Sequence, residues 1–99
     1  VVLDDWCEQQ GLTRIHFLRL DAGGIEMRIL QSSPRILSTV LVVVSRTYLG
    51  PANAAVISFP LLKQYLERHG FELLSHWYEE GAQGEATFVR RILYDSIFR

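Results

Sequence analysis

The apolar residues of this chain gather in runs of strand length, separated by polar segments that contain glycine. Arg14 to Leu20 carries apolar side chains on both of its faces, and Thr39 to Ser45 contains five consecutive aliphatic residues. Strands that are apolar on both faces are typical of parallel sheets covered by helices. The pattern therefore predicts two buried parallel strands, the second of them central in its sheet.

Apolar residues spaced three and four apart predict about three helices. Asp4 or Asp5 can cap a short helix through Gln10. Asp5 and Glu8 fit a capping box, and Gly11 suits the position after the end of the helix. The second helix has an apolar face of Ile25, Ile29 and Leu30, and the third carries a stripe of Leu62, Tyr65, Leu66 and His69. Gly70 is a suitable stop for the third helix.

The last third of the chain predicts an antiparallel hairpin. Phe71 to Tyr78 and Ala86 to Tyr94 are strand-like runs that flank a polar loop from Glu79 to Glu85. The first two strands are joined by a helix, so they are expected to be parallel with a right-handed crossover. The predicted fold is α/β, with two parallel strands, a C-terminal antiparallel hairpin and about three helices.

Length and charge restrict the functional classes. The 99 residues form a single domain, residues 1–99, and a net charge of −1 gives no footprint for nucleic acid or for an anionic membrane. The single cysteine, Cys7, favours a reducing, cytoplasmic compartment. The apolar runs are too short for a membrane span. Because the chain has no initiator methionine, we expect it to be a piece of a longer protein.

Candidate chemistry lies where the first strand ends. The apolar run stops at Asp21, turns on Gly23 and Gly24, and enters a helix that contains Glu26. Open α/β sheets bind ligands at the carboxyl ends of their strands, so Asp21 and Glu26 are the candidate site acids. Both also have a structural explanation, because acids near a helix N-terminus accept hydrogen bonds and favour the helix dipole.

The same segment resembles the motif after the fourth strand of FkbM-type methyltransferases, a hydrophobic run followed by Lys-x-Asp-x-Glu-Gly-x-Glu. Arg19 stands for the lysine, Gly23 replaces the middle glutamate, and the remaining matches are Asp21, Gly24 and Glu26. Leu3 to Cys7 and Tyr65 to Leu73 resemble two further phrases of that family, in the same order. The resemblance implies the C-terminal half of a class I, Rossmann-like methyltransferase sheet, whose last strand inserts antiparallel beside the fifth.

The resemblance also implies a function. FkbM-type enzymes transfer a methyl group from S-adenosylmethionine to a hydroxyl acceptor. Asp21 and Glu26 would be the catalytic candidates, Asp21, Gly23 and Gly24 the cofactor-binding ones, and no metal is implied. The family's fifth strand commonly ends on a glutamate, at or beside the position of Arg46, which we expect in a loop. The half that binds the methyl donor has no counterpart here, so we expect no turnover from this chain alone.

Two alternatives remain open. The chain can be a degenerate, non-catalytic half-domain that forms a homodimer through the edge strand Arg14 to Leu20, because an apolar edge tends to pair with another chain. It can also be a small stand-alone enzyme that uses Asp21 and Glu26. The histidines are too dispersed for a metal site, and His76 is expected on the surface of its strand.

Overall fold

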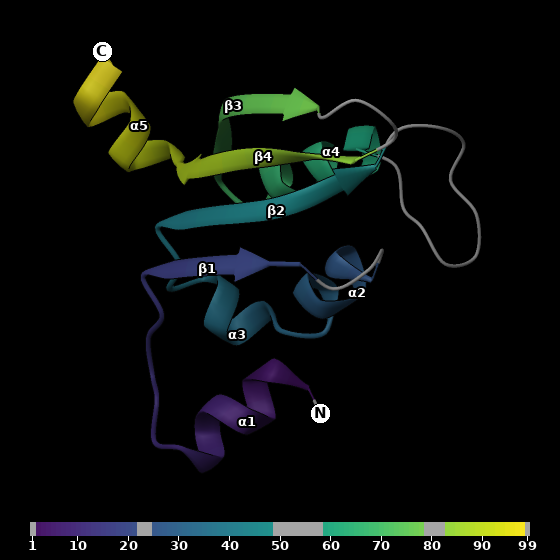
Figure 1. Ribbon diagram of the computed structural model, residues 1–99. Helices are drawn as coiled ribbons and strands as arrows, with labels where there is room; N and C mark the ends of the chain where they lie inside the picture. The colour runs from purple at the N-terminus through teal and green to yellow at the C-terminus, as the bar shows by residue number, and fades with distance from the viewer. Residues whose placement is uncertain (1, 22–24, 49–58, 79–82, 99) are drawn as a thin grey trace.

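A computed structural model of the chain describes residues 2–21, 25–48, 59–78 and 83–98. Their helices and strands follow one another along the chain in this order: α1 (Leu3–Gln9), β1 (Phe17–Leu20), α2 (Glu26–Gln31), α3 (Pro34–Leu37), β2 (Val42–Tyr48), α4 (Phe59–Arg68), β3 (Phe71–Tyr78), β4 (Gln83–Arg90) and α5 (Arg91–Phe98). The predicted α/β class is confirmed (Figure 1). The described residues form five helices, compared with about three expected.

The strands form one mixed sheet in the order β1-β2-β4-β3. The pair β1 and β2 is parallel, as predicted, and β4 runs antiparallel to both of its neighbours. The C-terminal hairpin of β3 and β4 is therefore present, and its second strand inserts beside β2. This order makes β1 one edge of the sheet and β3 the other.

The hydrophobic core lies on one face of this sheet. Side chains of β2 and β4 meet the buried side chains of the three connecting helices there: Leu30 of α2, Leu37 of α3, and Leu62 and Leu66 of α4. Val43, Phe71 and Phe88 form the floor of this core, each with 0% exposure. Right-handed crossovers from β1 to β2 and from β2 to β3 place all three helices on the same face.

The opposite face of the sheet has a different environment. Strand register places eleven residues on it: Phe17, Arg19, Val42, Val44, Arg46, Glu72, Ser75, Trp77, Glu85, Thr87 and Val89. Phe17 is 57% exposed and Trp77 is 46% exposed. Among the described helices, α1 packs on α3 and α5 extends from the end of β4 (Figure 1). Val44 and Val89 of this open face are nevertheless buried, with 7% and 5% exposure.

The first two strands differ from their predicted bounds. The first is shorter than Arg14 to Leu20, because the Ile15 amide donates to the Oγ1 atom of Thr39 and the ladder begins only at Phe17. The second strand has the predicted length but is shifted three residues toward the C-terminus, from Val42 to Tyr48. Arg46, expected in a loop, lies in this strand opposite Glu85.

The largest correction concerns the C-terminus. The strand predicted from Ala86 to Tyr94 ends at Arg90, and the following residues form α5. The Arg90 amide donates to the Leu41 carbonyl and the Arg91 amide to the Gly70 carbonyl, at the points where β2 and β3 begin. Beyond them the flanking strands offer no further ladder, so an extended chain would leave its backbone groups unpaired.

The predicted ends of the helices are confirmed by the structure, whereas the predicted start of the first helix is not. Gly11 and Gly70 follow α1 and α4 with φ of 73° and 88°, a region that glycine enters without strain. The capping box of Asp5 and Glu8 is wrong, because α1 begins at Leu3. Strand β4 begins at Gln83, inside the predicted loop, whereas the predicted turn at Gly23 and Gly24 falls outside the described residues.

Candidate functional site

Asp21 lies at the carboxyl edge of the sheet, as predicted. It follows the last residue of β1, and strand register places it beside Arg46 of β2. Their side chains form an ion pair of 3.4 Å between Nη2 and Oδ2, in which Asp21 is 60% and Arg46 22% exposed. An exposed pair of this kind contributes about 0–1 kcal/mol to stability, so Asp21 can exchange Arg46 for a charged ligand at little cost.

A second ion pair extends this site across the sheet. Glu85 of β4 lies opposite Arg46 in the strand register, and its carboxylate is 3.2 Å from the guanidinium of Arg19. The edge therefore carries acidic and basic groups in alternation, from Asp21 through Arg46 to Glu85. We call these three residues the charged row. Such an arrangement suits a small zwitterion, because the ammonium and the carboxylate of the ligand each meet an opposite charge.

Glu26 lies in a different environment from Asp21. It is the first residue of α2 and only 3% exposed. A carboxylate at that position is favoured by the amides and the dipole of its own helix. The structure thus places the two sequence-predicted acids in unlike surroundings, one buried at a helix start and one exposed at the charged row. The remaining predicted site residues, Gly23 and Gly24, are outside the described residues.

The core face of the same edge holds a polar cluster that the sequence did not predict. Thr47 is 1% exposed, and its Oγ1 lies 3.2 Å from Nε2 of His76. The His76 ring stacks on Phe59, with centroids 3.7 Å apart and planes 22° apart. The expectation of His76 on the strand surface is wrong. A bulge between Leu73 and Ser75 explains the difference. It reverses the alternation of side chains between the two faces of β3, so that His76 lies on the core face.

Acid is expected to destabilise the fold through His76. Burial lowers the pKa of His76 below its ordinary value of 6.5, so the unfolded chain binds this proton more readily than the folded chain does. The contribution of neutral His76 is complete above about pH 6.5 and is lost as the pH falls below that value. Thermal unfolding at about pH 7.5 and about pH 5.5 should show a smaller loss for His76→Gln than for the wild type.

The control for this prediction is His16→Gln, a change at an exposed histidine. It is expected to retain the wild-type dependence on pH. Equal losses of melting temperature in the wild type and in His76→Gln would show that His76 does not couple protonation to folding.

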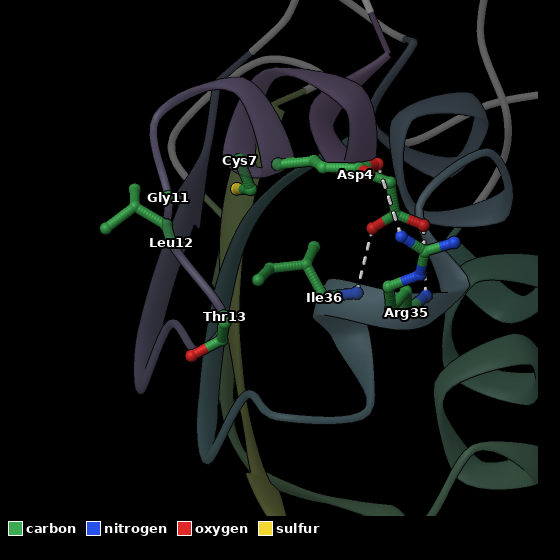
Figure 2. Close-up of a pocket in the computed structure, with 8 residues that line it drawn as sticks. Asp4, Cys7, Gly11, Leu12, Thr13, Arg35 and Ile36 are labelled. Carbon is green, nitrogen blue, oxygen red and sulfur yellow. Dashed lines mark hydrogen bonds and ion pairs between the residues drawn. The ribbon is translucent and has the colours of Figure 1, made fainter.

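A hollow near the N-terminus lies between α1 and α3, with a volume of about 220 Å³ (Figure 2). Its lining consists of Asp4, Cys7, Glu8, Gly11, Leu12, Thr13, Arg35 and Ile36. Cys7 is 2% exposed and lies at its α1 wall. None of these residues belongs to the charged row, so this hollow and the predicted site are separate features.

Asp4 of α1 lines this hollow and caps the N-terminus of α3, which lies about thirty residues further along the chain. Its Oδ2 accepts from the Arg35 amide at 3.0 Å and its Oδ1 from the Ile36 amide at 2.8 Å (Figure 2). Asp4→Ala is expected to cost about 1–2 kcal/mol, because it removes the partners of two helix N-terminal amides. Urea unfolding measures this loss. Asp5→Ala, an exposed neighbour on the same helix, is the control, and equal losses in the two variants would contradict the capping role.

The described residues contain neither a group of side chains that could hold a metal ion nor a helix that could span a membrane. In residues 2–21, 25–48, 59–78 and 83–98, no three histidine, cysteine or acidic side chains are grouped in a way that could hold a metal ion. No helix in that part of the chain is long and apolar enough to cross a membrane. Comparison with protein-family models, with curated proteins and with solved structures finds no match to this chain.

Proposed function

We propose that this chain is the C-terminal half of an FkbM-type domain that transfers a methyl group from S-adenosylmethionine to a hydroxyl acceptor. The observation that carries the proposal is the position of Asp21. It stands at the carboxyl end of a parallel strand, the place where open α/β sheets bind ligands. The antiparallel insertion of β4 beside β2 supports the same assignment.

The charged row gives this proposal its chemistry. The methionine end of S-adenosylmethionine is a zwitterion. In our proposal Asp21 receives its ammonium group and Arg46 its carboxylate, in exchange for the ion pair that they form with each other. Methyl transfer is an in-line displacement: the acceptor oxygen forms the new bond to carbon, the sulfonium leaves as a thioether, and a base takes the hydroxyl proton. Orientation supplies much of the rate, and Asp21 or Glu26 is proposed as the base.

Calorimetric titration with S-adenosylmethionine and S-adenosylhomocysteine tests this proposal. Half a site should bind weakly, with a dissociation constant of about 1 mM, equivalent to about −4 kcal/mol. Asp21→Asn is expected to remove the heat, while Asp5→Asn, far along the chain, keeps it. Absence of heat from the folded wild-type chain, or equal heat from Asp21→Asn, would contradict the proposal.

The ion pair between Asp21 and Arg46 favours a second candidate, a non-catalytic half-domain. An arginine at this position neutralises the acid that the site needs. We propose, in this case, that β1 pairs with the β1 edge of another copy, because it lies at the edge of the sheet and exposes Phe17. A folded chain that gives no heat with either ligand supports this candidate. For both candidates we propose a cytoplasmic location, on the single cysteine.

A further inference from the structure

Another hollow lies at the amino edge of the sheet, where β1 and β2 begin. It has a volume of about 240 Å³ and is lined by Arg14, His16, Ser38, Thr39 and Leu41. One wall is the segment that enters β1, and the other is the connection from α3 to β2 (Figure 1). The charged row lies at the opposite end of these strands, and the hollow between α1 and α3 shares no lining residue with this one.

Hydrogen bonds join the two walls of this hollow. The Ile15 amide donates to the Oγ1 atom of Thr39 at 3.0 Å. The His16 carbonyl accepts from the Leu41 amide at 2.8 Å. Ile15 packs against the hydrophobic core, and its two neighbours, Arg14 and His16, line the hollow. The backbone that carries these two basic side chains is therefore held in place before a ligand binds, which lowers the entropy cost of binding.

The charge that lines this hollow is positive. Arg14 supplies a guanidinium and His16 an imidazole, and no acidic side chain is among the lining residues. Neither basic side chain has a hydrogen bond or an ion pair within the part of the chain that the structure describes. Arg19, Arg46 and Arg91, by contrast, each pair with a carboxylate. A guanidinium with no carboxylate partner, beside an imidazole, favours an anion because both groups offer N–H donors.

Arg90 offsets the feature of this edge that would repel an anion. Carbonyl oxygens at the end of a helix carry partial negative charge, and α3 ends beside the hollow. Nη2 of Arg90 donates to the carbonyls of Leu37 and Val40, at 2.7 Å and 2.8 Å. The guanidinium balances the charge of these oxygens from within the fold, so the two basic side chains determine the potential of the hollow.

We propose that this hollow binds the phosphate group of a small phosphate monoester. The planar fork of Arg14 matches two oxygens of a tetrahedral oxyanion, and an N–H group of the His16 imidazole meets a third. Leu41 is 37% exposed and gives the carbon part of the ester an apolar wall. At about 30 Å³ per water molecule, the hollow is large enough for a phosphate and the carbon group that it esterifies.

The hydroxyl groups of the hollow have a different role from its basic side chains. Ser38 Oγ donates to the Arg35 carbonyl at 2.6 Å, and Thr39 Oγ1 donates to the Ile36 carbonyl at 2.7 Å. Each hydroxyl has a single proton, so both protons are already engaged. The phosphate is therefore held by the guanidinium and the imidazole, and removal of the Ser38 hydroxyl should leave its affinity unchanged.

This hollow is independent of the proposed methyl-donor site. S-adenosylmethionine carries no phosphate, and we place it at the carboxyl edge, whereas the hollow lies at the amino edge of the same strands. A titration with phosphate and without methyl donor tests the hollow alone, so failure of either proposal leaves the other unaffected.

Amide NMR titrations with inorganic phosphate and with glycerol phosphate test the proposal, at an ionic strength held constant with chloride. We expect shift changes to concentrate at Arg14, His16 and Thr39, with a dissociation constant of about 1 mM for glycerol phosphate. Inorganic phosphate should bind no more tightly, because it lacks the carbon group that lies against Leu41. Absence of shift changes at these residues overturns the proposal, and tighter binding of inorganic phosphate overturns the assignment to a monoester.

Three variants identify the groups that hold the phosphate. Arg14→Ala is expected to weaken binding at least about fivefold, because it removes the charged fork. Arg68→Ala is the matched control, since Arg68 is an exposed arginine of α4 outside the hollow, and Ser38→Ala is the control within it. Both controls should retain wild-type affinity. Circular dichroism shows that each variant is folded, and equal weakening by Arg14→Ala and Arg68→Ala overturns the proposal, because it indicates attraction by net charge alone.

Discussion

Arg90→Ala is expected to destabilise the chain by about 3–4 kcal/mol, a large part of the 5–15 kcal/mol typical of a domain. The guanidinium of Arg90 donates to three backbone carbonyls. Nη2 reaches Leu37 at 2.7 Å and Val40 at 2.8 Å, Nε reaches Val40 at 3.0 Å, and Nη1 reaches His69 at 2.7 Å. The side chain thus joins the end of α3, the start of β2 and the end of α4.

The cost has a clear physical origin. Carbonyls at helix ends lack intrahelical donors, and each one left without a partner in a partly buried site costs about 1–3 kcal/mol. The guanidinium also stacks over the ring of Phe71, with its carbon 4.1 Å from the centroid. Alanine would remove both interactions at once, although water entering the site limits the total.

Two variants distinguish the loss of these hydrogen bonds from the loss of the positive charge alone. Arg90→Lys keeps the charge but cannot reproduce the planar fork, so it should lose about half as much stability. Arg91→Ala removes the neighbouring arginine, whose contacts to Glu72 and Glu67 are exposed, and should cost at most about 1 kcal/mol. Urea unfolding measures all three. A loss for Arg90→Ala no larger than that for Arg91→Ala would contradict the joining role.

Leu66→Ala is expected to cost about 2–5 kcal/mol, because it opens a cavity in the core between α4 and the sheet. Leu66 is 0% exposed and belongs to the same packed cluster as Phe71 and Phe88. The loss combines the transfer energy of the missing methyl groups with the cavity that the sheet cannot fill.

The control for this variant is on the same helix. Leu61 of α4 is 45% exposed, and Leu61→Ala should change the free energy of unfolding by less than about 1 kcal/mol. Both variants delete the same atoms from the same secondary structure, so the difference between them measures burial. Chemical denaturation that gave equal losses would mean that α4 does not pack on the sheet as described.

Apolar patterning predicted the parts of the fold whose signal lies within one segment. The parallel pair, the hairpin and the helix of Leu62 and Leu66 follow from local runs and spacing. The first and last residues of a strand depend on the strands that pair with it, and the apolar pattern does not predict them. The end of β4 at Arg90 is set by where β2 and β3 begin, and the stretch to Tyr94 has the same apolar character in either conformation.

The candidate site likewise combines features that one segment determines with features that depend on neighbouring strands. Asp21 could be placed because it directly follows an apolar run, and the structure locates it at the carboxyl edge. Its pairing with Arg46 depends on strand register, which the sequence does not display. The inward position of His76 depends on one bulge, and a single extra residue reverses every side chain beyond it. The capping role of Asp4 spans more than thirty residues, beyond the reach of any local motif.

The measurement that most directly tests the proposed site is an amide NMR titration of the folded chain with S-adenosylhomocysteine. We expect chemical-shift changes to concentrate at the charged row, on Asp21, Arg46 and Glu85, and to disappear in Asp21→Asn. Residues lining the hollow between α1 and α3 should remain unchanged. Shift changes centred on that hollow, or none at millimolar ligand, would contradict a methyl-donor site at the carboxyl edge of this sheet.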